Sequence, residues 1–141
     1  MRETFTVRIA VRGYEIDAMG HLNGGVLYYQ YAEHARWELL RAAGVVLGGL
    51  LEHGVGPVNL ETTMRFHNEL RYENEVDVSC AFRWGVGKSF RAEQEFRRTD
   101  GILVAELSNV GGLMDLQARR LVVDPGAHFR ELATNPGLLG L

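Results

Sequence analysis

A short stretch near the N-terminus holds the residue types best suited to catalysis. The stretch EIDAMGHLNGG, residues 15–25, contains two carboxylates, a histidine, an asparagine and three glycines. A carboxylate such as Asp17 can act as a nucleophile or as a general base toward an activated carbonyl group. Aspartate in a loop also commonly caps backbone N–H groups of a turn. Residue type alone leaves both interpretations of Asp17 open.

The sequence on either side of this stretch predicts a strand before it and a helix after it. Apolar and polar residues alternate from Phe5 to Val11, which is typical of a half-buried strand. From Val26 to Ala43, apolar residues recur at spacings of three and four, which predicts an amphipathic helix of about five turns closed by Gly44. The first N–H groups of such a helix lack intrahelical partners, so they could stabilise negative charge on a carbonyl oxygen.

The rest of the chain has the alternating pattern of long antiparallel strands. The patterns cover residues 58–67, 76–84, 89–97, 102–114 and, as a possible extension, 119–123. The expected fold class is α+β, a curved antiparallel sheet of five or six strands wrapped around one long central helix. We expect one domain over residues 1–133 and a flexible tail over residues 134–141. Long edge strands invite pairing with a second copy, so we also expect a homodimer at least.

Composition and charge exclude several classes of function. The chain has 141 residues, of which 46% are hydrophobic, and this favours one globular domain over disorder. A formal net charge of −3 argues against nucleic-acid binding, and no apolar run is long enough to span a membrane. The single cysteine, Cys80, and the absence of a secretory leader predict a cytoplasmic protein. The histidines and carboxylates show no recognised metal-ligand spacing, so we expect no metal and no cofactor.

The loop and the helix together resemble a known family. The residues that carry the resemblance are Asp17, Gly20, His21, Asn23, Tyr28, Tyr31, Glu33, Ala35 and Arg36, with Lys88-Ser89-Phe90 and Asp100-Gly101 further along the chain. They are similar to the pattern of hotdog-fold acyl-CoA thioesterases, specifically the 4-hydroxybenzoyl-CoA thioesterase-like family. The chain departs from that pattern at Gly24, where the family has a second asparagine. Its helix residues also come one position later relative to Asp17.

The resemblance implies a hydrolase of acyl-CoA or acyl-carrier-protein thioesters, with Asp17 as nucleophile or general base. The backbone N–H of Asn23, Gly24 or Gly25 would bind the thioester carbonyl, while His21 would brace the loop. In the family, the aspartate and the helix end come from different subunits, so dimerisation would be part of catalysis. The expected assembly is a dimer as the minimal unit and a tetramer as the complete form.

Other residues have weaker assignments. Tyr28 on the helix and Glu61 on the second strand are candidate substrate contacts, and core packing or a solvated strand face is the alternative for each. The resemblance implies that Lys88 and Ser89 bind coenzyme A. The alternative is that they only form an exposed strand end, where lysine and serine are also common. Glu15 is expected to lie on the surface at a strand end.

Asn23 is expected to cap the helix, for which asparagine is a preferred residue, or to orient the loop, and contact with the substrate is the second interpretation.

Two other functions stay open at this point. A hotdog enoyl-thioester hydratase or dehydratase would use Asp17 and His21 as acid and base, although such enzymes commonly place these groups one residue further apart. A non-catalytic module that binds acyl thioesters would also be compatible with the departures at Gly24 and in the helix. Fold alone cannot decide among them, because one scaffold can support several chemistries.

Overall fold

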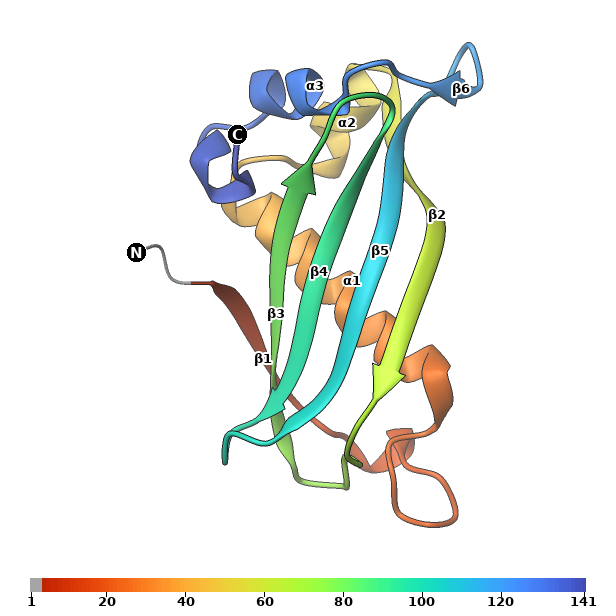
Figure 1. Cartoon of the computed structure of the whole chain (residues 1–141), viewed down its shortest axis with the longest axis vertical. Coiled ribbons are helices and arrows are strands. Elements are labelled where there is room, and N and C mark those ends of the chain that lie inside the picture. Colours follow the sequence, from red (N-terminus) through yellow and green to blue (C-terminus); the bar gives the residue numbers. More distant parts are fainter. Residues whose placement is uncertain (1–3) are drawn as a thin grey trace.

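The computed structural model describes residues 4–141, which form one antiparallel sheet curled around a long helix (Figure 1). The strands are β1 (Phe5–Ala10), β2 (Val55–Phe66), β3 (Glu75–Trp84), β4 (Ser89–Arg98), β5 (Leu103–Asp115) and β6 (Arg120–Leu121). The helices are α1 (Gly24–Ala42), α2 (Leu47–Glu52) and α3 (Pro125–Leu132), with 3-10 turns η1 (Gly13–Glu15) and η2 (Pro136–Leu139). The strand order is β1-β3-β4-β5-β2, with β6 paired to β5. This is the α+β arrangement that the sequence predicts.

Alternation along the strands places one face of the sheet against α1. On β3, for example, Val76 and Val78 are fully buried, while Asp77 between them is partly exposed. The α1 residues buried against the sheet are Tyr28, Tyr31, Ala32, Ala35, Leu39 and Leu40. Gly44 follows the helix with φ of +90°, the left-handed conformation expected of a closing glycine. Within residues 4–141, no helix is both long and apolar enough to cross a membrane.

The core divides into two clusters along α1. The cluster near the start of the helix packs Tyr28, Tyr31 and Ala35 against sheet residues that include Val78 and Phe96. A second cluster surrounds the end of the helix, and its buried members include Leu39, Leu40, Phe82, Phe90, Leu113, Phe129 and Leu139. The two halves of one helix therefore face different surroundings, and each half borders its own pocket.

Strand β2 is an edge of the sheet with an unusual pattern of exposure. A half-buried strand exposes every second residue, yet the five consecutive residues from Asn59 to Thr63 are all exposed. The strand also contains a β-bulge between Asn59 and Glu61 in its pairing with β5. Helix α1 therefore does not cover the inner face of this part of β2.

The last residues of the chain pack onto the rest of the molecule, although the sequence predicts a flexible tail over residues 134–141. Leu139 is buried, and its carbonyl accepts a hydrogen bond from Nε1 of Trp84 (2.6 Å). The N–H of Asn135 donates to the carbonyl of Ala43 at the end of α1 (3.0 Å). The sequence pattern missed these contacts because a buried leucine in a short 3-10 turn has no periodic signature. The domain boundary at residue 133 stays a prediction, and residues 1–3 lie outside the described part.

Candidate active site

The Asp17 carboxylate is held by the backbone of its own loop. Its Oδ1 accepts hydrogen bonds from the N–H groups of Met19 (2.9 Å) and His21 (3.1 Å). The N–H of Asp17 donates in return to the carbonyl of His21 (2.8 Å). These backbone bonds, led by that from His21, lower the pKa of Asp17 from its ordinary value of 3.8. The carboxylate is therefore ionised at neutral pH, as both a nucleophile and a general base require.

His21 joins this loop to the segment that follows β2. Its Nε2 lies 2.6 Å from Oε2 of Glu69, and the other oxygen of Glu69 pairs with NH2 of Arg71 (2.7 Å). The N–H of Leu22 donates to the carbonyl of Leu70 (2.7 Å). The ring of His21 thus contacts the Glu69 carboxylate, while its backbone N–H donates to Asp17. This geometry fits the bracing role expected of His21, and Glu69 is a partner that the sequence pattern did not indicate.

The contacts at the start of α1 show which of the three candidate backbone N–H groups are free to bind a carbonyl oxygen. The N–H of Asn23 donates to the carbonyl of Glu15 (2.8 Å), so it is not available to a substrate. Its side chain makes no capping hydrogen bond either, so the helix cap expected of Asn23 is wrong, while its role in orienting the loop stays a prediction. Within residues 4–141, the N–H groups of Gly24 and Gly25 have no hydrogen-bond acceptor, as expected for a first helical turn.

Gly24 has a conformational reason to be glycine. Its φ is +58°, in the left-handed region that side chains other than asparagine and aspartate rarely enter. A Cβ added there would meet nothing within 4 Å, so conformation rather than space restricts this position. Glycine in place of the family's asparagine therefore preserves the backbone conformation at this position, because glycine and asparagine both tolerate this φ.

Asp17 and the free helix N–H groups open into the same pocket of a single chain. The pocket is lined by Asp17, His21, Leu22, Gly24, Gly25, Tyr28, Phe66, His67, Asn68 and Glu69. One chain thus places Asp17 and a helix end on the same pocket, and the contribution of a second subunit, which the family resemblance implied, stays a prediction. Tyr28 is buried in the pocket wall, with its ring edge-on to Phe66 at 5.1 Å between ring centroids. Burial raises the pKa of the Tyr28 hydroxyl, which therefore stays protonated.

Glu15 is buried, so the expectation of a surface position is wrong. Its Oε1 accepts hydrogen bonds from the hydroxyl of Tyr31 (2.5 Å) and from the N–H of Arg12 (2.9 Å). Its carbonyl also holds the N–H of Asn23. Glu15 therefore ties the loop to the inner face of α1. The available signal was Tyr31, a polar group on the apolar face of the predicted helix that needs a partner when buried.

Three of the predicted substrate contacts do not reach this pocket within one chain. Glu61 is exposed on β2, five residues and about 17 Å along the strand from Phe66. Lys88 and Ser89 lie at the turn from β3 to β4, at the opposite end of the sheet from the Asp17 loop (Figure 1). Within residues 4–141, no group of three or more histidine, cysteine or acidic side chains is arranged to hold a metal ion.

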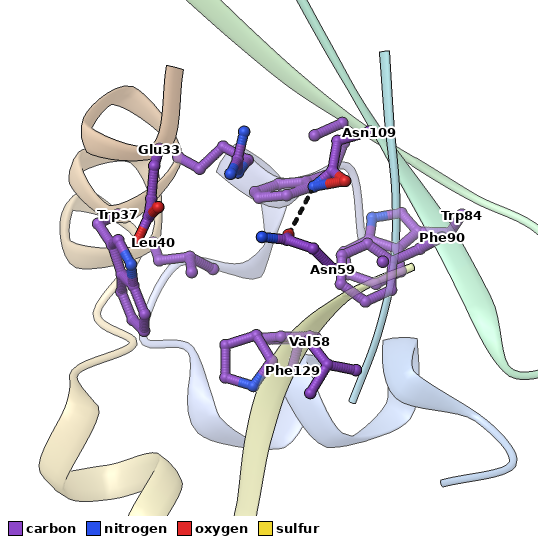
Figure 2. Close-up of a pocket in the computed structure, with 14 residues that line it drawn as sticks. Glu33, Trp37, Leu40, Val58, Asn59, Trp84, Phe90, Asn109 and Phe129 are labelled. Carbon is purple, nitrogen blue, oxygen red and sulfur yellow. Dashed lines mark hydrogen bonds between the residues drawn. The ribbon is translucent and has the colours of Figure 1, made fainter. Parts of the chain in front are cut away.

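A second pocket lies between α1 and the sheet, beside the later half of the helix. Figure 2 shows Glu33 and Trp37 of α1 on one side and Asn59 of β2 and Asn109 of β5 on the other. The Nδ2 of Asn109 donates to Oδ1 of Asn59 (2.9 Å). The volume of the pocket is about 110 Å³. The sequence did not indicate this pocket, because its walls come from residues between 33 and 129.

Comparison with known proteins identifies the family to which this chain belongs. Residues 11–131 match the family described as the Thioesterase-like superfamily. The chain belongs to this superfamily. An 80-residue region is 35% identical to the chloroplastic acyl-acyl carrier protein thioesterase ATL3 of Arabidopsis thaliana. That region spans 57% of this superfamily member and only 42% of the Arabidopsis relative.

Solved structures of similar shape show that this superfamily member has a hotdog fold. SAV2348 from Staphylococcus aureus, solved in complex with CoA, has a TM-score of 0.81 and 18% identity, and the match covers 100% of this chain and 94% of that one. The probable thioesterase YbaW from Escherichia coli has a TM-score of 0.78 and 21% identity, with 89% and 93% of the two chains covered.

Proposed function

We propose that the protein hydrolyses acyl thioesters, with Asp17 as nucleophile or general base. The observation that carries this proposal is the shared pocket, whose lining includes both the ionised Asp17 and the residues Gly24 and Gly25 with their free N–H groups. The N–H groups would bind the carbonyl oxygen and stabilise its negative charge as a tetrahedral intermediate forms. Membership of the Thioesterase-like superfamily supports the same reaction.

Two routes use the same geometry. As a general base, Asp17 takes a proton from water, the hydroxide adds to the carbonyl, and the C–S bond breaks to release the thiol with that proton. As a nucleophile, a carboxylate oxygen adds to the carbonyl and the C–S bond breaks to release a thiolate; water then hydrolyses the mixed anhydride to two carboxylates, and one of the protons released converts the thiolate to the thiol. The substrate would be an acyl-CoA or an acyl-carrier-protein thioester. The solved complex of SAV2348 with CoA and the acyl carrier protein named for the Arabidopsis relative support these two carriers.

A homodimer through β2 would explain the exposure of this edge strand. Antiparallel pairing of two β2 strands about a twofold axis near Glu61 would cover the exposed stretch from Asn59 to Thr63. The same pairing would bring the Phe66 end of one copy, with its Asp17 pocket, beside the opposite end of the other copy. Lys88 and Ser89 would then lie at the same end of the assembly as the partner's Asp17 loop. We propose that these two residues contact the carrier group there, and that a tetramer is built from such dimers.

The test is release of free thiol from a panel of acyl-CoA and acyl-carrier-protein thioesters, run with wild type and Asp17→Asn. Loss of the carboxylate should lower kcat/KM by about 100-fold to 10,000-fold. Because the pKa of Asp17 is lowered, the acidic limb of the kcat/KM profile should lie below the ordinary value of 3.8.

Asp115→Asn is the matched control, because Asp115 also accepts backbone N–H bonds within its own turn, from Gln117 and Ala118 (both 2.9 Å). It should leave turnover unchanged. Equal turnover of wild type and Asp17→Asn would show that the loop carboxylate is only a turn residue.

A further inference from the structure

The pocket beside the later half of α1 has the composition of a binding site rather than of a packing defect. Protein interiors are close-packed, so an opening of about 110 Å³ beside the core requires an explanation. Much of its lining is aromatic or aliphatic, and the amide pair of Asn59 and the buried Asn109 adds polar groups. Apolar walls with a few placed polar groups are the usual lining of a small-molecule site.

Arg36 adds a second feature at the polar side of this pocket. Its NH1 donates to Oε1 of Gln94 (3.0 Å), and Gln94 in turn donates to the carbonyl of Ala32 (2.9 Å). Among the described residues, no carboxylate lies within 4.0 Å of the Arg36 guanidinium. Burial lowers the pKa of this guanidinium, as expected for a cation removed from water. Arg36 therefore adds a guanidinium group without a carboxylate partner among the described residues to the lining of the pocket.

One part of the pocket lining is a cluster of three aromatic side chains in mutual contact. The ring of Trp84 stacks on Phe90 at 4.8 Å, and Phe129 of α3 contacts both, at 5.5 Å from Trp84 and 5.7 Å from Phe90. Figure 2 shows these rings from different elements around one end of the pocket. Phe129 is buried, so the floor is not a mobile surface ring.

The C-terminal segment holds this floor in place. The hydrogen bond from Trp84 Nε1 to the Leu139 carbonyl fixes the indole, and the bond from Asn135 to Ala43 anchors the segment to α1. Thr134 packs against Gly44, where an added Cβ would lie only 2.1 Å from the threonine Oγ1. These contacts give the pocket a fixed depth.

We propose that this pocket receives the acyl group of the thioester and that the segment from α3 to the C-terminus limits it to a short chain or one aromatic ring. The proposal rests on the thioesterase function given above. An apolar cavity of about 150 Å³ binds benzene, so a pocket of about 110 Å³ limits the acyl group to at most one ring or a short aliphatic chain. Phe129 and Trp84 are then the residues that determine acyl length.

The position of the pocket relative to Asp17 fits a dimeric site. Within one chain the pocket begins near Glu33, about 12 Å along the helix from Gly25, which is too far for a short acyl group. In the antiparallel β2 dimer, the Phe66 end of one strand lies beside the Val58 end of the other. The Asp17 pocket of one copy therefore opens next to the acyl pocket of its partner.

Hydrolysis tests acyl length directly. Wild type should show a higher kcat/KM for butanoyl-CoA, hexanoyl-CoA and benzoyl-CoA than for dodecanoyl-CoA. Phe129→Ala should raise the ratio of dodecanoyl to hexanoyl turnover by about tenfold or more, because each methylene accepted into an apolar pocket changes kcat/KM by about that factor. Phe129→Leu, a milder change, should shift the ratio in the same direction. It provides the test if the alanine variant folds poorly. Leu50→Ala, which opens the same cluster without lining the pocket, should leave the ratio unchanged.

Tryptophan fluorescence provides a readout that does not depend on hydrolysis. The chain has two tryptophans, and both Trp37 and Trp84 line this pocket. Benzoate and hexanoate should change the emission saturably, and dodecanoate should do so only in Phe129→Ala. Absence of hydrolysis together with this response would overturn the thioesterase function and leave the pocket assignment standing. A preference of wild type for dodecanoyl-CoA, an unchanged ratio in the Phe129 variants, or no response to the short acids would overturn the inference.

Discussion

The two ends of helix α1 border pockets that are built in opposite ways. At the first end, Met19 and His21, a few positions away, hold the Asp17 carboxylate, and the distant segment at Glu69 and Leu70 supports the loop. At the other end, the pocket draws on α1, four strands and α3, and its floor depends on the last residues of the chain. The carboxylate at the first end is therefore positioned by a local turn, whereas the second pocket exists only after the whole chain has folded. Substitutions at the two ends should therefore have different consequences.

The largest effect on stability should come from the C-terminal end. Leu139→Ala removes a buried side chain from the second cluster and should lower the free energy of unfolding by about 2–5 kcal/mol in urea titrations. The neighbouring Leu138 is 37% exposed, so Leu138→Ala should cost much less. Equal and small losses for both variants would show that the tail is as loose as the sequence suggests.

A smaller effect is expected at the turn into α1. Gly24→Ala forces a Cβ into a residue with φ of +58° and should cost about 1–2 kcal/mol of folding free energy. Gly24→Asn should cost less, because asparagine tolerates this conformation. Thermal denaturation of both variants, beside Gly25→Ala, measures the difference. An alanine variant as stable as the asparagine variant would contradict a conformational requirement at this position.

The smallest effect should come from the ion pair that braces the Asp17 loop. Glu69→Gln removes a charge that is 41% exposed and should change the free energy of unfolding by less than about 1 kcal/mol. A drop in kcat/KM that exceeds the loss of stability, and that added salt reproduces in wild type, would show that the pair positions the loop. Glu131→Gln breaks the longer pair with His53 (3.7 Å) and serves as the control. Identical kinetics for the two variants would mean that His21 needs no charged partner.

Much of the fold could be predicted from residue periodicity. The alternating stretches became long strands, and the three-and-four spacing after the loop became α1, because one sheet and one helix can bury their apolar faces only against each other. The predicted helix began at Val26, whereas α1 begins at Gly24. The left-handed φ of Gly24 that precedes the regular turn has no signature in a hydrophobic pattern.

The candidate site was predicted as a set of residues but not as a set of contacts. Asp17, His21 and the two glycines singled out by the motif line one pocket at the start of α1, and their roles stay a prediction. They did not reveal that the N–H of Asn23 is already bonded to Glu15, or that Glu69 holds the His21 ring. Such partners depend on how separate segments meet in space, which spacing along the chain does not encode.

The strand and helix pattern, the loop with its carboxylate and the superfamily could all be inferred from the sequence, because each depends on residues close together in the chain. The free backbone N–H groups, the burial of Glu15 and the pocket closed by the last residues became visible only in the folded chain. These features depend on long-range contacts such as that between Trp84 and Leu139. A hydrogen bond between residues so far apart forms only when the sheet has curled around the helix and brought them together.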